Sequence, residues 1–318
     1  MKWIWFWCGI LLTSGPGPGR LRADPGHEKI IASLTEQIAA GSRDPALYFQ
    51  RGWNYREMPQ APAGAARLDF LKALELDAGF LPAKRELARL EAEEGKLEDA
   101  VRRLRGALDP APARPTAELA GCWSLLADYL LLLNRAEEAR TAAEAGLQTA
   151  GGLTVDLTLT LGEALRRLHR EGERIRCLTG AARAVHSAIL EDALTDALID
   201  ARHIAEAQPR VENGLAGSRW KAPWLIRRAR LRLAVAGEQE SAAGDLRAAL
   251  AEIGGRMADG LPVGPDVFCD RGAARAMLGE TTGARQDLAM AISRGAESWR
   301  LRVLESLLPL PAPRGQQH

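Results

Sequence analysis

A spacing of small residues recurs along this sequence and constrains its fold more than any other feature. From Gly272 the chain places Gly279 7 residues on, and Ala284, Leu288 and Ala291 12, 16 and 19 residues on. The same offsets apply from these other starting residues: Gly52 (with two extra residues in the turn), Ala88, Ala127 and Arg230. Such repetition at a fixed spacing is typical of stacked supersecondary units.

A helical hairpin explains why small residues are needed at these offsets. Two antiparallel helices approach closely only where small side chains lie at their crossing, so Ala88 is expected to face Ala100. The large residue four positions further on, such as Leu104, fills the gap between neighbouring hairpins. A left-handed turn is predicted after the first helix at three glycines: Gly95, Gly237 and Gly279. Each hairpin leaves an apolar face uncovered, so the hairpins must stack into a solenoid.

The pattern resembles the tetratricopeptide repeat (TPR) family. The segments similar to its signatures are Trp123-x-x-Leu126-Ala127-x-x-Leu130, Tyr48-x-x-Arg51-Gly52-x-x-Tyr55 and the second-helix ending at residues 70–77. The resemblance implies an all-α fold, a right-handed solenoid of helical hairpins (an α-α superhelix) with terminal capping helices. A composition rich in Ala and Leu, with only 5% aromatic residues, also favours helices over strands.

The repeats suggest an organisation in five segments. These are a signal peptide (1–23), an N-terminal helix with three TPR-like repeats (24–153), degenerate helical pairs (154–222), two repeats with a capping helix (223–308) and a disordered tail (309–318). The degenerate segment departs from the pattern because Arg174 stands where a small residue is expected. The Gly/Pro-rich connection from Gly217 to Pro223 is a candidate hinge.

The amino terminus has the features of a secretory signal. Lys2 precedes an apolar run from Trp3 to Leu12, and small residues lead to a cleavage site expected after Ala23. The run is too short to span a membrane, although an uncleaved anchor is the alternative. We therefore expect an exported protein, periplasmic or extracellular, in a bacterial envelope.

No residue pattern in the sequence indicates catalysis, a metal or a cofactor. The known metal, nucleotide and hydrolase motifs do not occur, and no histidine or cysteine has a partner at ligand spacing. With 42 Lys+Arg against 41 Asp+Glu, net charge does not point to nucleic acid as a partner. Asp196 and Asp200 share one helical face, which we expect to be solvated rather than catalytic. We expect a protein that is not an enzyme and binds no cofactor.

The TPR resemblance implies that the first helices line a concave groove for a partner. By register, the candidate groove residues are Phe49, Trp53, Arg56, Arg85, Arg89, Ser124, Asp128, Trp224, Arg227 and Leu231. Aromatic and arginine side chains are typical of interface hot spots, although Trp53 and Trp224 are equally expected to pack against adjacent helices. The basic and Asn set with which some family members clamp a terminal carboxylate is not reproduced.

These features predict a non-catalytic interaction scaffold or adaptor that binds an unidentified protein or peptide. Two alternatives remain at this point. The first is a regulatory or substrate-presenting subunit of a hydrolase or of a secretion or envelope-assembly complex. The second is a structural scaffold that self-associates into a homo-oligomer. Neither nucleic acid nor a stable membrane span is expected after signal cleavage.

Overall fold

The computed structural model describes residues 25–58, 60–109, 117–149, 154–296 and 298–308. Within these residues the chain forms sixteen α-helices and no β-strand, which confirms the all-α prediction. The predicted signal peptide (1–23) and tail (309–318) lie outside the described residues. The chain divides into two compact units, Met1–His169 and Arg170–His318.

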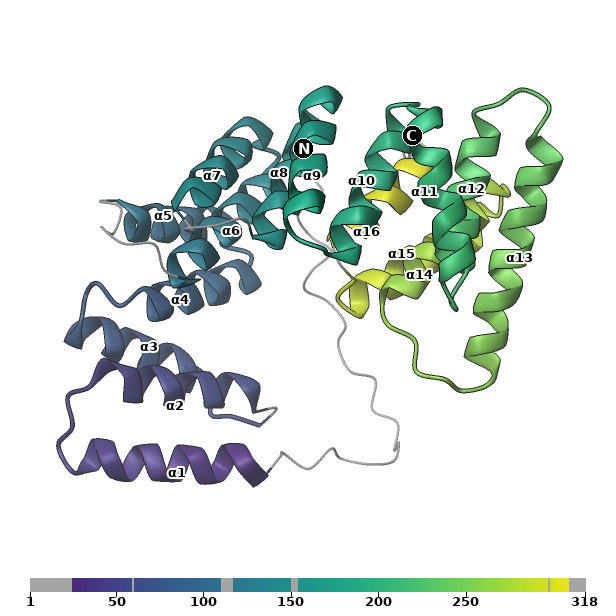
Figure 1. Cartoon of the computed structure of the whole chain (residues 1–318). Coiled ribbons are helices and arrows are strands. Elements are labelled where there is room, and N and C mark those ends of the chain that lie inside the picture. Colours follow the sequence, from purple (N-terminus) through teal and green to yellow (C-terminus); the bar gives the residue numbers. More distant parts are fainter. Residues whose placement is uncertain (1–24, 59, 110–116, 150–153, 297, 309–318) are drawn as a thin grey trace, which may run out of the picture. The chain divides into compact units, whose positions relative to one another are not determined.

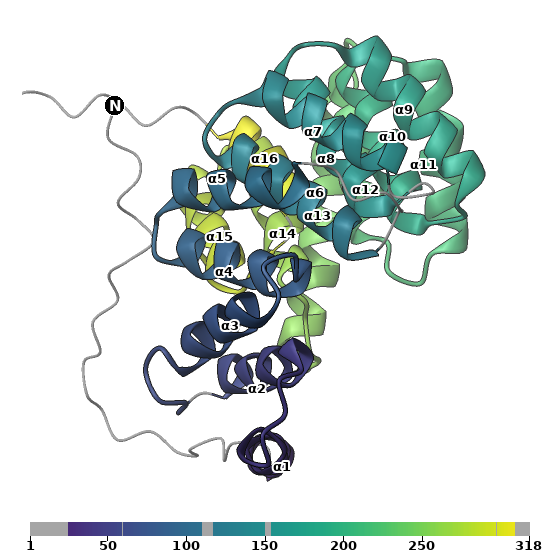
Figure 2. The same ribbon diagram turned by 90° about the vertical axis from the view of Figure 1, so that its left-hand side faces the viewer.

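Unit 1 is a stack of hairpins (Figures 1 and 2). Its helices are α1 (Pro25–Ala39), α2 (Pro45–Glu57), α3 (Ala65–Leu76), α4 (Leu81–Glu93), α5 (Leu97–Leu108), α6 (Ala117–Leu132), α7 (Ala136–Thr149) and α8 (Val155–Arg167). Helix α1 packs on α2, the pairs α2/α3, α4/α5 and α6/α7 form antiparallel hairpins, and α8 packs on α6 and α7.

Unit 2 continues the same kind of packing. Its helices are α9 (Glu171–Ala184), α10 (Ala188–Asp200), α11 (Ile204–Gly217), α12 (Ala222–Leu233), α13 (Gln239–Ala258), α14 (Asp266–Met277), α15 (Thr281–Ser293) and α16 (Ser298–Leu307). Each helix from α9 to α15 packs against the next, and α16 packs on α14 and α15. The hinge expected from Gly217 to Pro223 lies between α11 and α12, inside this unit.

The turns follow the predicted spacing. Gly95, Gly237 and Gly279 have φ values of 79°, 87° and 83°, which confirms the left-handed turn at these positions. Other residues adopt the same conformation directly after the first helices α6, α8 and α10: Asn134, His169 and Arg202. The turn spacing therefore continues through residues 154–222, which looked degenerate in sequence. Glycine is preferred in a left-handed turn, but other residues can adopt this conformation.

The crossing residues are buried as the hairpin argument requires. Ala88, Ala100, Ala127 and Ala139 have no exposed surface. The large residue Leu104 is also completely buried. A side chain larger than Ala at these positions would force the helix axes apart, so this spacing holds each hairpin together.

Ion pairs that the sequence analysis missed also join the two helices of a hairpin. The acidic residue immediately before the large apolar residue accepts from an arginine of the first helix, with a closest N–O distance of 2.5–2.7 Å. The pairs are Arg51–Asp69, Arg228–Asp245 and Arg271–Asp287. The three carboxylates are almost fully buried, so each arginine neutralises a charge that would otherwise be costly to bury.

The division between the units falls beside a departure from the repeat pattern. Residue 174, where the spacing asks for a small side chain, is Arg174. Its guanidinium is used inside unit 2, where Nη1 lies 3.2 Å from Glu171 and 3.0 Å from Asp200. Arg174 is buried and both of its ion-pair partners lie in unit 2.

Candidate functional site

The first helices of unit 1, α2, α4, α6 and α8, share one face, which we call the unit 1 face. At its centre is Glu86 of α4, whose side chain is completely buried. Arg56 of α2 donates to Glu86 and, at 2.6 Å, to Glu93. The guanidinium of Arg56 also lies 5.9 Å from the ring centroid of Trp53. One buried carboxylate thus anchors an arginine and an aromatic residue that the sequence had placed in a groove.

Two further predicted groove residues gather at the same carboxylate. Arg85 Nε lies 3.4 Å from Glu86, and Arg89 Nη1 lies 3.7 Å from it. These contacts are long, and the two side chains are 23% and 35% exposed. The structure therefore brings Arg56, Arg85 and Arg89 together at one carboxylate. Sequence reasoning missed Glu86, which the repeat spacing did not distinguish from the surface glutamates around it.

Ser124 and Asp128 lie further along the unit 1 face, on α6. Asp128 accepts a hydrogen bond from the hydroxyl of Thr160 on α8, at 2.9 Å. Beside them, burial raises the pKa of Tyr129 to about 12. This end of the face is neutral or acidic, in contrast to the arginines of α2 and α4.

Phe49, the remaining groove candidate of unit 1, packs into the interior. Its ring centroid lies 5.7 Å from that of Phe70 and 5.6 Å from that of Phe80. Both neighbours belong to the apolar cluster between the first two hairpins. Phe49 therefore contributes to packing between hairpins, because its side chain points toward α3 and the start of α4 rather than along the face.

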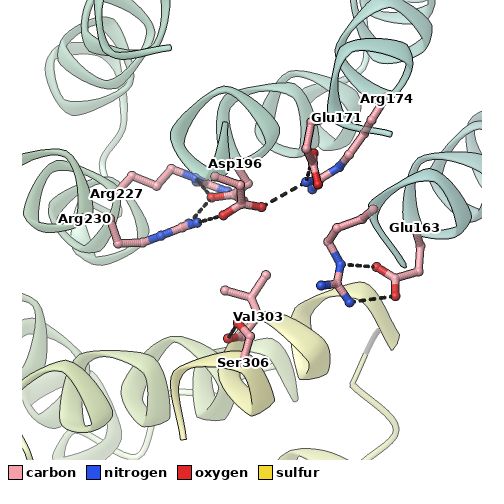
Figure 3. A network of polar contacts seen from close by, with 10 residues as sticks. Glu163, Glu171, Arg174, Asp196, Arg227, Arg230, Val303 and Ser306 are labelled. Carbon is pink, nitrogen blue, oxygen red and sulfur yellow. Dashed lines mark hydrogen bonds and ion pairs between the residues drawn. The ribbon is translucent and has the colours of Figure 1, made fainter. Parts of the chain in front are cut away.

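The first helices of unit 2, α10, α12 and α14, form a corresponding surface, the unit 2 face. Here the carboxylate of Asp196 forms an ion pair with Arg227, with an N–O distance of 2.9 Å, and a second ion pair with Arg230 (Figure 3). Asp196 is only 4% exposed, so our expectation of a solvated aspartate was wrong. Burial opposes its charge, but the two guanidiniums outweigh burial and hold the pKa of Asp196 below its usual value.

The unit 2 groove candidates are mostly packed. Arg227 is buried, stacks 4.8 Å from the ring centroid of Trp224, and has one nitrogen, Nη1, with no hydrogen-bond partner among the described residues. The Trp224 ring lies directly against Gly214 of α11, where a Cβ would collide with it. Leu231 is buried as well. These three side chains serve the interior of unit 2, because the ring and the guanidinium fill space between helices.

A second buried aspartate lies on the unit 2 face. Burial raises the pKa of Asp270 on α14 to about 6, against the opposing attraction of Arg300 and Arg227. Asp196, Asp270 and Arg300 line a cavity of about 30 Å³. No sequence signal distinguished Asp270, whose burial arises from helices distant along the chain.

Unit 1 also has an open apolar hollow between α5, α6 and α7. Its volume is about 420 Å³, with Trp123, Leu126 and Leu130 on its floor and Arg105 and Glu138 at its rim. The hollow lies on the side of α6 that the second helices α5 and α7 flank, away from the arginine cluster.

Three further features of the described residues concern metal ligands, helix hydropathy and thiols. No group of three or more His, Cys, Asp or Glu side chains among them is placed to hold a metal ion. None of their helices has the length and apolar character needed to cross a bilayer. Burial raises the pKa of Cys122 to about 11 and that of Cys269 to about 12, so both are unreactive thiols at neutral pH.

Comparisons with known proteins agree with the arrangement of hairpins. No family model and no curated protein matches the sequence. Among solved structures, a tetratricopeptide repeat protein from Parabacteroides merdae is similar with a TM-score of 0.53 and 13% identity, over 89% of this chain and 99% of that one. The Cut9–Hcn1 hetero-tetramer of the APC/C is similar with a TM-score of 0.52 and 15% identity, over 84% of this chain and 46% of that one. This chain thus matches less than half the length of that chain. At these identities the likeness concerns the fold, and the chain has the fold of a tetratricopeptide repeat protein, an all-α solenoid of helical hairpins.

Proposed function

We propose that this chain is a non-catalytic protein-interaction scaffold, and that its unit 1 face docks an acidic segment of a partner protein. The observation that carries the proposal is the convergence of Arg56, Arg85 and Arg89 on the single buried carboxylate of Glu86. The likeness of the fold to a tetratricopeptide repeat protein supports an interaction role in general.

The arginines favour an acidic partner. Glu86 is shared among three guanidiniums, and its contacts with Arg85 and Arg89, at 3.4 and 3.7 Å, are long. A guanidinium binds a carboxylate with two parallel hydrogen bonds, which suits Asp, Glu or a terminal carboxylate of a docked segment. Burial of Glu86 holds the cluster in place before the partner arrives, which lowers the entropy cost of docking.

Neighbouring side chains define the rest of the docking surface. Trp53 offers an aromatic surface next to Arg56, a combination common at interface hot spots. Ser124 and Asp128 extend the surface on α6 and would receive polar groups of the same segment. Phe49, Trp224, Arg227 and Leu231 are packed in the interiors of their units and are not part of it.

The test is a crosslinked pull-down from envelope extract with two variants of opposite expectation. Arg85→Glu/Arg89→Glu reverses two charges at the cluster and should abolish capture of the partner. Arg102→Glu/Arg247→Glu reverses two charges at strongly exposed arginines away from the cluster and should leave capture unchanged. Equal capture by both variants, or no capture by the native chain, would refute the docking face.

Export is a separate part of the proposal. Residues 1–23 would direct the chain out of the cytoplasm and be removed, so that the unit 1 face works in the envelope or outside the cell. Mass spectrometry of the chain recovered from fractionated cells should show a mature form that begins near residue 24. A full-length chain in the soluble cytoplasmic fraction would count against export.

A further inference from the structure

Helix α16 occupies an unusual place for the last helix of a solenoid. Each stacked first helix contacts mainly the second helix of the hairpin before it, as α14 packs more extensively on α13 than on α12. Helix α16 reverses this preference, because it packs more extensively on α14 than on α15. It is therefore shifted from the end of the stack toward the unit 2 face.

The contact between α16 and α14 is close. Leu304 is completely buried, and a Cβ on Gly272 would lie 2.6 Å from its Cδ2. Gly272 is the crossing residue of α14, the position at which the repeat pattern permits the nearest approach of another helix. The absence of a side chain at Gly272 thus makes room for α16 as well as for α15.

A single arginine ties α16 to two first helices. Arg300 lies 3.3 Å from Asp270 and 3.6 Å from Asp266, both on α14. It also lies 3.7 Å from Asp192 on α10. Because α10 precedes α14 by two hairpins, α16 reaches back across the unit 2 face instead of only closing its last hairpin.

Four residues on one side of α16 contact the unit 2 face, and Leu301 packs separately against the cluster around Phe268. Arg300, Val303, Leu304 and Leu307 are spaced i, i+3, i+4 and i+7, so they share a helical face. Val303 and Leu304 line the cavity beside Arg227, and Val303 points toward the Asp196 network in Figure 3. Leu307 packs on the apolar cluster of α12, α13 and α14. An arginine and aliphatic side chains thus fill a surface of aspartates and apolar groups.

The attachment has features of a reversible one. The Arg300 contacts with Asp192, Asp266 and Asp270 are 3.3 Å or longer, whereas Arg227 reaches Asp196 at 2.9 Å. A helix of 10 residues is too short to be stable by itself in water, so α16 depends on its docking. Loss of the Arg300 and Leu304 contacts should therefore release the helix as a unit.

We infer that α16 is a built-in occupant of the unit 2 face, and that this face receives a partner helix of the same chemistry. The partner helix carries an arginine followed by aliphatic residues at i+3, i+4 and i+7, and it displaces α16 on binding. Helix α16 is then an autoinhibitory element that keeps the face closed until a competing helix arrives. The inference does not depend on the docking face proposed for unit 1.

The test uses a fluorescent synthetic peptide of residues 296–308 as the probe and the full chain as the receptor. The variant Arg300→Glu/Leu304→Ser should release α16. Its affinity for the peptide, measured by fluorescence anisotropy, should be at least tenfold higher than that of the native chain. Ser306→Ala changes an exposed residue of the same helix and should bind like the native chain. A peptide that itself carries Arg300→Glu should bind neither receptor. Equal affinity of the native and released chains, or no binding by a released chain of native helicity, would overturn the inference.

Hydrogen exchange of the native chain provides a second measurement that needs no variant. Amides of α16 should exchange at least tenfold faster than those of α14, and excess peptide should accelerate α16 further. Protection of α16 equal to that of α14, unchanged by peptide, would overturn the inference even if the released variant failed to fold. Arg85→Glu/Arg89→Glu should leave peptide binding unchanged, which separates this result from failure of the unit 1 proposal.

Discussion

The two units place a buried carboxylate at the same kind of position and reach opposite results. In unit 1, Glu86 gathers arginines that are 21–35% exposed, so these side chains keep part of their surface in solvent. In unit 2, Asp196 pairs with Arg227, which is only 5% exposed in its side chain, and α16 lies beside the pair. The repeat spacing is common to both units. It therefore specifies how the helices cross, but it does not specify which side chains are exposed on each face.

Removal of the central carboxylates gives the largest expected difference between the units. Asp196→Asn should destabilise unit 2 by about 3–5 kcal/mol, because Arg227 would be left buried beside a neutral partner. Glu86→Gln should cost unit 1 only about 1–2 kcal/mol, since the arginines there can turn to solvent. Hydrogen exchange of α10 and α12, compared with α4, measures the two effects separately. Equal losses would mean that the unit 1 arginines are as enclosed as Arg227.

Acidification should affect unit 2 through Asp270. Its pKa is about 6 in the folded chain against an ordinary 3.8, so the native state binds the proton more tightly and stability falls as pH rises from 4 to 6. Complete ionisation of Asp270 lowers the free energy of unfolding by about 3 kcal/mol, which is the energy equivalent of this pKa difference. The groups facing it are Arg300, Arg227, Asp196 and Asp266. Urea unfolding of unit 2 at pH 4–7 should show this fall, and Asp270→Asn should remove it; an identical slope in the variant would exclude Asp270 as its source.

Two glycines at the same repeat offset, one in each unit, allow the tightness of helix packing in the two units to be compared. Gly146 stands 19 residues after Ala127, and Gly214 stands 19 residues after Thr195, which precedes the left-handed turn at Arg202 by seven residues; other hairpins have Ala at this offset. A Cβ at Gly146 would lie 2.7 Å from Trp123 Cβ, and one at Gly214 would run into the ring of Trp224. Each substitution to Ala should destabilise its own unit by about 1–3 kcal/mol, more at Gly214 because the indole is rigid.

A glycine with free space around it serves as the control for both. Nothing lies within 4 Å of a Cβ placed at Gly244 of α13. Gly244→Ala should therefore stabilise by about 0.5–1 kcal/mol through helix propensity alone. Thermal unfolding followed by circular dichroism measures all three variants, and stabilisation by Gly214→Ala would show that Trp224 is not held where the structure places it.

An exposed ion pair of unit 1 gives the smallest expected effect. Hydrogen bonds from Arg135 and Arg105 lower the pKa of Glu138 to about 2 from an ordinary 4.5. The stabilisation it provides is complete above pH 4.5 and is lost as pH falls toward 2. Because the pair is about half exposed, Glu138→Gln should cost only about 0.5 kcal/mol at neutral pH. A loss above 2 kcal/mol would mean that this rim is buried in solution.

The helices and their turns were largely predictable because their causes are local. Crossing residues such as Ala88 and Ala100, and turn glycines such as Gly95, are read from spacing alone. The same rule matched the degenerate pairs of residues 154–222 only loosely, since His169 and Arg202 adopt the left-handed turn without being glycine. Spacing identified the arginines of the unit 1 face but not Glu86, because burial of a glutamate depends on neighbours from other hairpins.

The sequence by itself determined that the chain is an all-α stack of hairpins, since small residues at fixed offsets permit little else. It also determined many of the crossing residues and the glycine turns, but not the turns at His169 and Arg202. Only the tertiary structure decided that Asp196 is buried, that Trp224 fills the space beside Gly214, and that α16 lies over first helices of unit 2. The physical reason is that burial and ion pairing join residues up to about a hundred positions apart, as Arg300 and Asp192 show, and no periodic pattern records those distances.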